Sequence, residues 1–223
     1  MTIYTYSGDV GDFRAENIRI RNGEIIIDFV APDTRIKDIK LGVPVSINIE
    51  NGVAAMALAH LSGVTDEEIK QGMESFCGVD RRFDFKIKTD KLVFLSDYAH
   101  HPSEIKQSIL SLRELYTGRK ITVVFQPHLY SRTNDFYKEF ADSLSLADEV
   151  ILLDIYPARE KPIPGVTSEL IYKNLKQNIE KSLCTKEELV DKLREMPLDI
   201  LITLGAGDIE DYVPRIYQML NDK

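Results

Sequence analysis

The sequence predicts an α/β protein in which a doubly wound, mainly parallel sheet follows a small α+β segment. From about residue 90 onward, apolar runs of strand length alternate with stretches of helical periodicity. Those runs are continuous rather than alternating in polarity, which is typical of parallel strands covered on both faces. The first forty positions instead alternate apolar and polar residues between turn residues. This change of rhythm predicts two units of different architecture.

The first unit is expected to contain short strands followed by two helices. The strands are expected within the segments TIYTYSGD, FRAENIRIRNGEIIIDFV and RIKDIKLGV, and the Asn-Gly of the second is a strong hairpin signal. The segment NIENGVAAMALAHLSG places Ala, Met and Leu at helical spacing and ends at Gly63. In the next expected helix, Thr65 is the N-cap and Glu68, three residues later, completes a capping box.

The second unit is expected to contain four buried strands with helices between them. The strands are expected within KLVFLSDY, KITVVFQP, DEVILLDIYP and LDILITLGAG. The helices are expected within PSEIKQSILSLRELY, SRTNDFYKEFADSLSLA, TSELIYKNLKQNI and IEDYVPRIYQMLNDK. In the first of these helices, one face carries Ile105, Ile109, Leu112 and Tyr116. The boundary between the units is placed between residues 82 and 90, which gives one domain over 1–85 and another over 86–223.

Composition excludes several classes of partner. The formal net charge of −8 argues against a general affinity for nucleic acid or for an acidic membrane surface. No apolar run approaches the roughly 18 residues of a membrane-spanning helix, and the chain opens with no secretory signal, so a cytoplasmic protein is expected. Cys77 and Cys184 lie far apart and fit no metal or redox spacing, so both are expected to be reduced, buried thiols.

Polar residues follow each of the four predicted parallel strands. Ligands of open parallel sheets bind at the carboxyl ends of the strands, so this edge is the candidate site. Three of the four histidines fall there. The segments at these ends are Asp97-Tyr98-Ala99-His100-His101, Gln126-Pro127-His128, Asp154-Ile155-Tyr156 and Gly205-Ala206-Gly207-Asp208.

The segment DYAHHP admits two readings. A metal pair is excluded, because adjacent extended residues point in opposite directions and no further ligand spacing accompanies His100 and His101. The segment is either a plain strand–turn–helix with Pro102 at the first helical position, or a site in which a histidine carries a proton, donates to a carboxylate or caps the helix. The residues alone leave both open.

The segment FQPHLYSRT is more distinctive. Arg132 lies beside a helix start that Ser131 or Thr133 would cap, which is a natural place to clamp a carboxylate or phosphate. The alternative is a solvated Arg132 with Tyr130 packed against the protein.

The remaining motifs are weaker: the Gly-rich TLGAGD is typical of a turn, the paired Arg of GVDRRF is typical of a basic turn, and the Asn residues of NIEN are typical of helix caps. The chain contains no Gly-Lys dipeptide, and therefore no P-loop.

In this order, the motifs resemble those of the Mur ligase family. They are NIEN, GVDRRFD, DYAHHPSEIKQSI, FQPHLYSRT, DEVILLDIYPAREKPIPGVTSELI and LGAGDI. The resemblance implies three domains: one for a UDP-sugar, a central P-loop domain for ATP, and a carboxyl-terminal Rossmann-like domain that receives an amino acid. Residues 1–85 would then be the end of the central ATP-binding domain and 86–223 the amino-acid-binding ligase domain, within a fragment of a longer enzyme.

The resemblance also implies a reaction. ATP and Mg²⁺, bound largely by the missing part of the chain, would phosphorylate the carboxylate of UDP-N-acetylmuramate, and L-alanine would attack the acyl phosphate to form an amide in peptidoglycan biosynthesis. The fragment alone would be inactive, with no nucleic-acid or membrane partner, and a monomer or weak dimer. Two alternatives stay open: a ligase of the family that recycles a murein tripeptide, and a stand-alone nucleotide-binding or regulatory module.

Matching positions imply a role for each candidate residue. His100 and Arg132 would be catalytic, and the substrate would be bound by Tyr98, His100, His128 and Arg132. The nucleotide would be bound by Asn48, Asn51, Arg82 and Asp97, where Asp97 holds ribose or orients the closed domain interface. No residue is expected to bind a metal. Of the adjacent histidines, His100 is expected to face the site and His101 to serve the helix start. Three positions depart from the family pattern, namely Ile47, Ser96 and Leu129.

Overall fold

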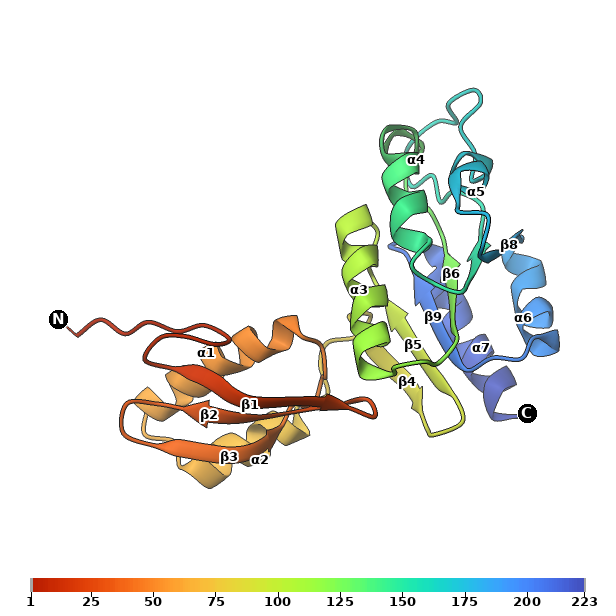
Figure 1. The fold of residues 1–223 in the computed structure, drawn as a ribbon. Coiled ribbons are helices and arrows are strands. Elements are labelled where there is room, and N and C mark those ends of the chain that lie inside the picture. Colours follow the sequence, from red (N-terminus) through yellow and green to blue (C-terminus); the bar gives the residue numbers. More distant parts are fainter. Residues whose placement is uncertain (1, 223) are drawn as a thin grey trace. The chain divides into compact units, whose positions relative to one another are not determined.

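Two sheets organise the chain, one in each of two units (Figure 1). The structure is a computed structural model that describes residues 2–222. The first unit runs to Gly78 and includes Arg113–Thr117, and the second contains Val79–Leu112 and continues from Gly118.

The first unit pairs a three-stranded antiparallel sheet with two helices. Its strands β1 (Arg14–Arg21), β2 (Glu24–Val30) and β3 (Arg35–Lys40) lie in sequence order. The predicted hairpin is confirmed, because Asn22 and Gly23 both adopt the positive φ that a type I′ turn requires. Helices α1 (Ile47–Leu61) and α2 (Asp66–Ser75) follow, and the Thr65–Glu68 capping box is present with both of its hydrogen bonds.

The strand expected within TIYTYSGD does not form. Residues 2–8 contribute only a single bridge, between Tyr6 and Phe13. The physical reason is local competition: the Asp12 carboxylate accepts hydrogen bonds from both the backbone N–H and the hydroxyl of Thr5. Ser7 likewise bonds the backbone of Val10. Such side chain–backbone bonds offer the chain an alternative to a sheet ladder.

The second unit confirms the predicted fold class. Its six-stranded sheet has the order β4-β5-β9-β6-β7-β8, and every neighbouring pair is parallel except β4 with β5. The four predicted strands are present as β5, β6, β7 and β9, with β9 between β5 and β6. The strand bounds are β4 (Asp84–Lys88), β5 (Val93–Asp97), β6 (Ile121–Phe125), β7 (Glu149–Leu152), β8 (Glu180–Leu183) and β9 (Ile200–Leu204).

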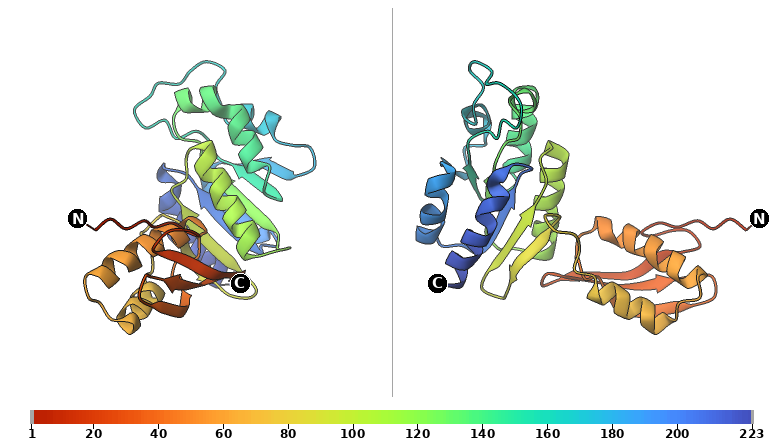
Figure 2. Two further views of the ribbon diagram at one scale, coloured as in Figure 1. Left: turned by 60° about the vertical axis from the view of Figure 1, so that its left-hand side comes forward. Right: turned by 180° about the vertical axis from the view of Figure 1, so that it is seen from behind.

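Helices cover both faces of this sheet. Helices α3 (Pro102–Leu115) and α4 (Tyr130–Leu144) lie on one face, and α6 (Lys186–Glu195) and α7 (Val213–Asn221) lie on the other (Figure 2). The short α5 (Glu169–Asn174) packs beside α4, and a 3-10 turn, η1 (Asp208–Tyr212), leads into α7. The apolar face predicted for α3 is confirmed, because Ile105, Ile109 and Leu112 are fully buried.

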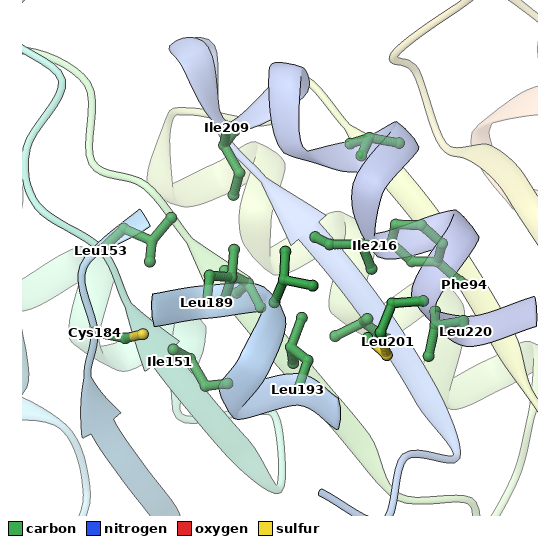
Figure 3. Packing of buried hydrophobic residues seen from close by; sticks show 14 residues of the cluster. Phe94, Ile151, Leu153, Cys184, Leu189, Leu193, Leu201, Ile209, Ile216 and Leu220 are labelled. Carbon is green, nitrogen blue, oxygen red and sulfur yellow. The ribbon is translucent and has the colours of Figure 1, made fainter. Parts of the chain in front are cut away.

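A buried apolar cluster joins the sheet to α6 and α7 (Figure 3). Phe94, Ile151 and Leu201 project from three strands, and each is 0% exposed. They pack with Leu189 and Leu193 of α6 and with further apolar residues of α7. Burying such side chains contributes roughly 1.5–3 kcal/mol each. The cluster therefore holds the strands, and the loops at their carboxyl ends, in fixed register.

Several elements differ from expectation. Strands β4 and β8 and helix α6 were not predicted, since both strands lie at the sheet edges and carry charged residues rather than an apolar run. Helix α5 ends at Asn174, well before the end of the expected segment, because Leu175 is extended. Cys184 is buried as expected, but Cys77 is exposed, because it lies in the solvent-facing stretch after α2. Within residues 2–222, no helix has the length and apolar character needed to cross a membrane.

Candidate active site

Four of the predicted site residues come together at the carboxyl ends of β5 and β6. The ring centroids of Tyr98 and His100 lie 5.2 Å apart, and those of His100 and His128 lie 6.1 Å apart, both edge to face. Arg132, in the first turns of α4, is close enough for its charge to lower the pKa of His128. The ring contacts of Tyr98, His100 and His128, with Arg132 on the adjacent first turn of α4, therefore support the interpretation of this edge as a site.

The two adjacent histidines have different partners. His100 Nδ1 lies 2.9 Å from the carbonyl oxygen of Tyr98, which can only accept, so Nδ1 carries a hydrogen and, in the neutral form of the ring, the lone pair is on Nε2. His101 Nδ1 instead bonds the Ser103 hydroxyl at 2.8 Å and lies 3.4 Å from the Ser103 backbone nitrogen. The prediction that His101 serves the start of α3 is confirmed. Glu104 accepts hydrogen bonds from the backbone N–H groups of both histidines and fixes the turn.

His128 and Arg132 each bury a polar atom that has no hydrogen-bond partner. These atoms are His128 Nδ1 and Arg132 Nη1. Burial is the main cause that lowers the pKa of His128, the charge of Arg132 lowers it further, and the carboxylate of Glu160 acts in the opposite direction. His128 is therefore neutral at neutral pH. An unpaired guanidinium beside a neutral imidazole is an arrangement suited to binding an anion.

The start of α4 differs from expectation, because neither Ser131 nor Thr133 caps it. Leu129 is the N-cap residue, with a φ of 74° and no side-chain cap bond. The Thr133 hydroxyl donates to the Leu129 carbonyl. Ser131 is itself a donor, and its backbone N–H and hydroxyl both bond the carboxylate of Glu160. The cap thus comes from a distant loop, a relation that sequence spacing does not reveal.

Asp97 directs its carboxylate into the protein. The buried Ser108 hydroxyl donates to it, and backbone groups of Phe83 and Ala99 also bond it. Burial nevertheless raises the pKa of Asp97 above its ordinary value. Asp97 therefore ties the end of β5 to α3 and to the segment before β4. Its expected contact with a nucleotide stays a prediction.

Arg81 is a residue that sequence reasoning missed. Its guanidinium carbon lies 4.6 Å from the centroid of the Tyr98 ring, and its Nε lies 3.3 Å from Glu210 Oε2. Glu210 also accepts a hydrogen bond from Ser96 at 3.1 Å. Arg82, the neighbour singled out from the sequence, is exposed. The Arg-Arg dipeptide could not indicate which member turns inward, because that depends on the positive φ of 65° at Arg81.

The Gly-rich loop after β9 approaches another part of this chain. A Cβ on Gly207 would lie 2.4 Å from Gln126 Oε1 and 2.7 Å from Tyr156 Cβ. Gln126 is locked in place, because its Oε1 accepts from Ile209 N at 3.0 Å and its Nε2 donates to Asp208 Oδ1 at 2.7 Å. The interpretation of this segment as a turn is correct, and its glycine serves internal packing.

Gly207→Ala is expected to lower the free energy of unfolding by about 1–3 kcal/mol, the usual cost of overpacking. Urea unfolding followed by circular dichroism measures it. Gly72→Ala is the matched control, since no atom lies within 4 Å of a Cβ at that position in α2. That change is expected to stabilise the helix by up to about 1 kcal/mol. Equal effects of the two substitutions would contradict the packing argument.

The predicted nucleotide residues of the first unit lie in the first turns of α1. Asn51 Nδ2 donates to Asn48 Oδ1 at 3.2 Å, and Asn48 Nδ2 donates to the Val43 carbonyl at 3.1 Å. The N-cap is Ser46, so neither Asn caps the helix. Asn51 is exposed and Asn48 is half-buried. Their expected role at adenine and ribose stays a prediction.

Comparison with known proteins identifies the family. A family model described as "Mur ligase, glutamate ligase domain" matches residues 81–207. The chain belongs to the Mur ligase family. The match contains Tyr98, His100, His128 and Arg132, so the geometric cluster lies inside the Mur ligase domain. Asn48 and Asn51 lie outside the matched range.

Individual relatives of this Mur ligase chain are named for alanine addition. The UDP-N-acetylmuramate–L-alanine ligase of Phocaeicola vulgatus is 72% identical over 99% of the chain and 48% of its own length. That of Porphyromonas gingivalis is 50% identical over 99% of the chain and 49% of its own length. The crystal structure of the UDP-N-acetylmuramate–alanine ligase from Thermotoga maritima matches with a TM-score of 0.77 and 26% identity, covering 96% of this chain and 47% of that one. The Mur ligase chain thus spans about half the length of the curated relatives it matches.

Proposed function

We propose that this chain is the carboxyl-terminal part of an ATP-dependent ligase that joins L-alanine to UDP-N-acetylmuramate in peptidoglycan biosynthesis. The observation that carries the proposal is the 72% identity, over 99% of the chain, to a relative named for that reaction. Because relatives at 72% and 50% identity share that name, tripeptide recycling is not favoured. In the proposal, residues 1–85 end a central ATP-binding domain, 86–223 form the amino-acid-binding domain, and the enzyme works in the cytoplasm.

The site residues suit the attack of an amine on an acyl phosphate. Arg132 would bind the anionic oxygens, because its buried Nη1 lacks a partner. Donors placed in advance at a developing oxyanion are worth about 10²–10³ in rate. His100 Nε2, with its free lone pair, would accept the proton that the attacking amine releases as the C–N bond forms and the phosphate leaves. Tyr98 and His128 would enclose the substrate beside them.

ATP would supply the transferred phosphoryl group, with Mg²⁺ as its counter-ion. The residues present do not fit the metal, since 2–222 contain no group of three or more His, Cys, Asp or Glu able to hold one. The sequence also lacks a P-loop. We therefore assign no step of this chain to the metal or the phosphates. The amides of Asn48 and Asn51 and the exposed Arg82 offer donors that suit adenine and ribose. Asp97 would act by holding the end of β5.

An ADP-release assay with UDP-N-acetylmuramate and L-alanine tests the proposal. The 223-residue chain alone is expected to show no turnover, because it lacks a P-loop. A longer polypeptide that joins the chain to an upstream segment carrying G-x-x-G-K-[ST] is expected to turn over only when L-alanine is present. Robust turnover by the chain alone, or a longer protein that accepts a tripeptide and not L-alanine, would overturn the proposal.

A further inference from the structure

The loop that follows β7 is fastened to the loop that carries His128. The backbone N–H of Tyr156 donates to the Pro127 carbonyl at 2.8 Å, and the backbone N–H of Leu129 donates to the Tyr156 carbonyl at 2.9 Å. The ring of Tyr156 stacks on that of His128, with centroids 5.6 Å apart and planes 26° apart. The β7 loop therefore fixes one face of the His128 imidazole.

Glu160, farther along this loop, supplies the cap that α4 lacks. Its Oε2 accepts the Ser131 backbone N–H at 2.9 Å, and its Oε1 accepts the Ser131 hydroxyl. These two hydrogen bonds lower the pKa of Glu160, so the group is ionised at neutral pH. A carboxylate at a helix N-terminus satisfies donors that would otherwise be left without partners, and it is favoured by the helix dipole.

The arrangement has a consequence for Arg132, the next residue after Ser131. Both Glu160 oxygens are engaged by Ser131, and Arg132 forms no ion pair within the described part of the chain, residues 2–222. The guanidinium is therefore held by its helix turn but is not neutralised. The loop between Tyr156 and Glu160 turns sharply, with a Glu160 N–H to Pro157 carbonyl bond of 2.9 Å and a φ of 49° at Ala158.

We infer that Glu160 is a positioning residue that orients Arg132 and His128 for an anionic substrate group. The inference rests on the proposed function for the identity of that group. Glu160 does not touch the reacting atoms. It fixes the first turn of α4, and Tyr156 on the same loop fixes the imidazole.

Hydrogen exchange and histidine NMR on the 223-residue chain test the positioning directly. The matched control is Glu188→Ala, because the Glu188 carboxylate also accepts the N–H and the hydroxyl of a single residue at a helix start, Thr185 of the α6 capping box, and α6 carries no predicted site residue. Glu160→Ala is expected to speed exchange of the Ser131 amide by at least about tenfold and to shift the His128 ring resonances. His60 should stay unchanged. Glu188→Ala should affect only the start of α6.

Steady-state kinetics of the longer ligase test the consequence. Glu160→Ala is expected to lower kcat/KM for L-alanine by about 10–100-fold, since a misplacement of about 1 Å can cost 10²-fold. Glu160→Gln should recover most of that loss, because its amide oxygen still accepts from Ser131, and it guards against a folding defect. Glu188→Ala should stay within about twofold of the unchanged enzyme. Wild-type kinetics for Glu160→Ala, or equal losses for Glu188→Ala, would overturn the inference.

The two proposals fail in distinguishable ways. If the unchanged longer protein does not ligate L-alanine, the proposed function is wrong, while the exchange and NMR readouts still judge the role of Glu160. If the unchanged protein ligates L-alanine, but Glu160→Ala changes neither the exchange rate of the Ser131 amide nor the His128 ring resonances, only the positioning role is wrong.

Discussion

Arg132→Ala in the longer ligase is expected to lower kcat/KM by about 10²–10³-fold, the usual cost of removing one preplaced oxyanion donor. The same substitution is expected to change the free energy of unfolding by less than about 1 kcal/mol. The reason is that Arg132 Nη1 is buried without a partner, so its removal breaks no hydrogen bond and relieves an unsatisfied donor. Steady-state kinetics and urea unfolding measure the two effects.

The control for this prediction is Arg194→Ala. Arg194 lies on α6 with an exposed side chain paired to Asp191, so neither kinetics nor stability should change appreciably. Arg132→Lys keeps the charge but loses the planar fork, and should recover only part of the rate. A large loss of stability with little loss of rate in Arg132→Ala would show that the residue is structural.

Asp97→Ala is expected to lower the free energy of unfolding by about 2–4 kcal/mol. The change leaves the backbone groups of Phe83 and Ala99 without this acceptor, and each orphaned buried donor costs about 1–3 kcal/mol. The Ser108 hydroxyl loses its bond to Asp97 but keeps the Glu104 carbonyl as an acceptor at 3.1 Å. Ser108→Ala in the same background is the informative second variant. It should cost little once Asp97 is absent, because the two changes remove the same contact.

The pH dependence of stability gives a separate check on Asp97. Because burial raises the pKa of Asp97 above its ordinary value of 3.8, the folded state holds this proton to a higher pH than the unfolded state does. The contribution of Asp97 to stability is therefore greatest below pH 3.8 and falls as the pH rises through the folded pKa. Asp97→Asn should remove that fall. A wild-type profile that rises relative to the Asn variant over this range would contradict the assignment.

The sequence predicted an element correctly where a single local pattern, such as an apolar run or a capping box, is enough to specify it. Continuous apolar runs marked β5, β6, β7 and β9, and the Thr65 capping box marked the start of α2. The edge strands β4 and β8 were missed, because an edge strand needs no apolar run and is stabilised by its single neighbour. The start of α6 carries a signal that is visible in the sequence, the Thr185–Glu188 capping box, although α6 was not among the predicted helices.

The site was predictable at the level of the sheet edge but not at the level of its supports. Parallel topology placed His100, His128 and Arg132 together because strand ends converge. The supports come from residues distant in sequence: Glu160 reaches Ser131, and Glu210 reaches Ser96 and Arg81. Such pairings depend on the backbone torsions at Arg81, Leu129 and Ala158, which all have positive φ. Positive φ is uncommon for non-Gly residues, so the residue types at these positions do not predict it.

The position of β9 between β5 and β6 determines when the sheet can be completed during synthesis on the ribosome. Strand β9 pairs with β5 on one side and β6 on the other, and no ladder joins β5 to β6 directly. During synthesis, the segment carrying His100 and the segment carrying His128 thus stay in separate sheet fragments until residues 200–204 have left the exit tunnel. A nonsense codon between β7 and β9 would release a polypeptide in which β5 and β6 each keep one neighbour but expose the edge that β9 covers, a preferred target for aggregation and proteolysis.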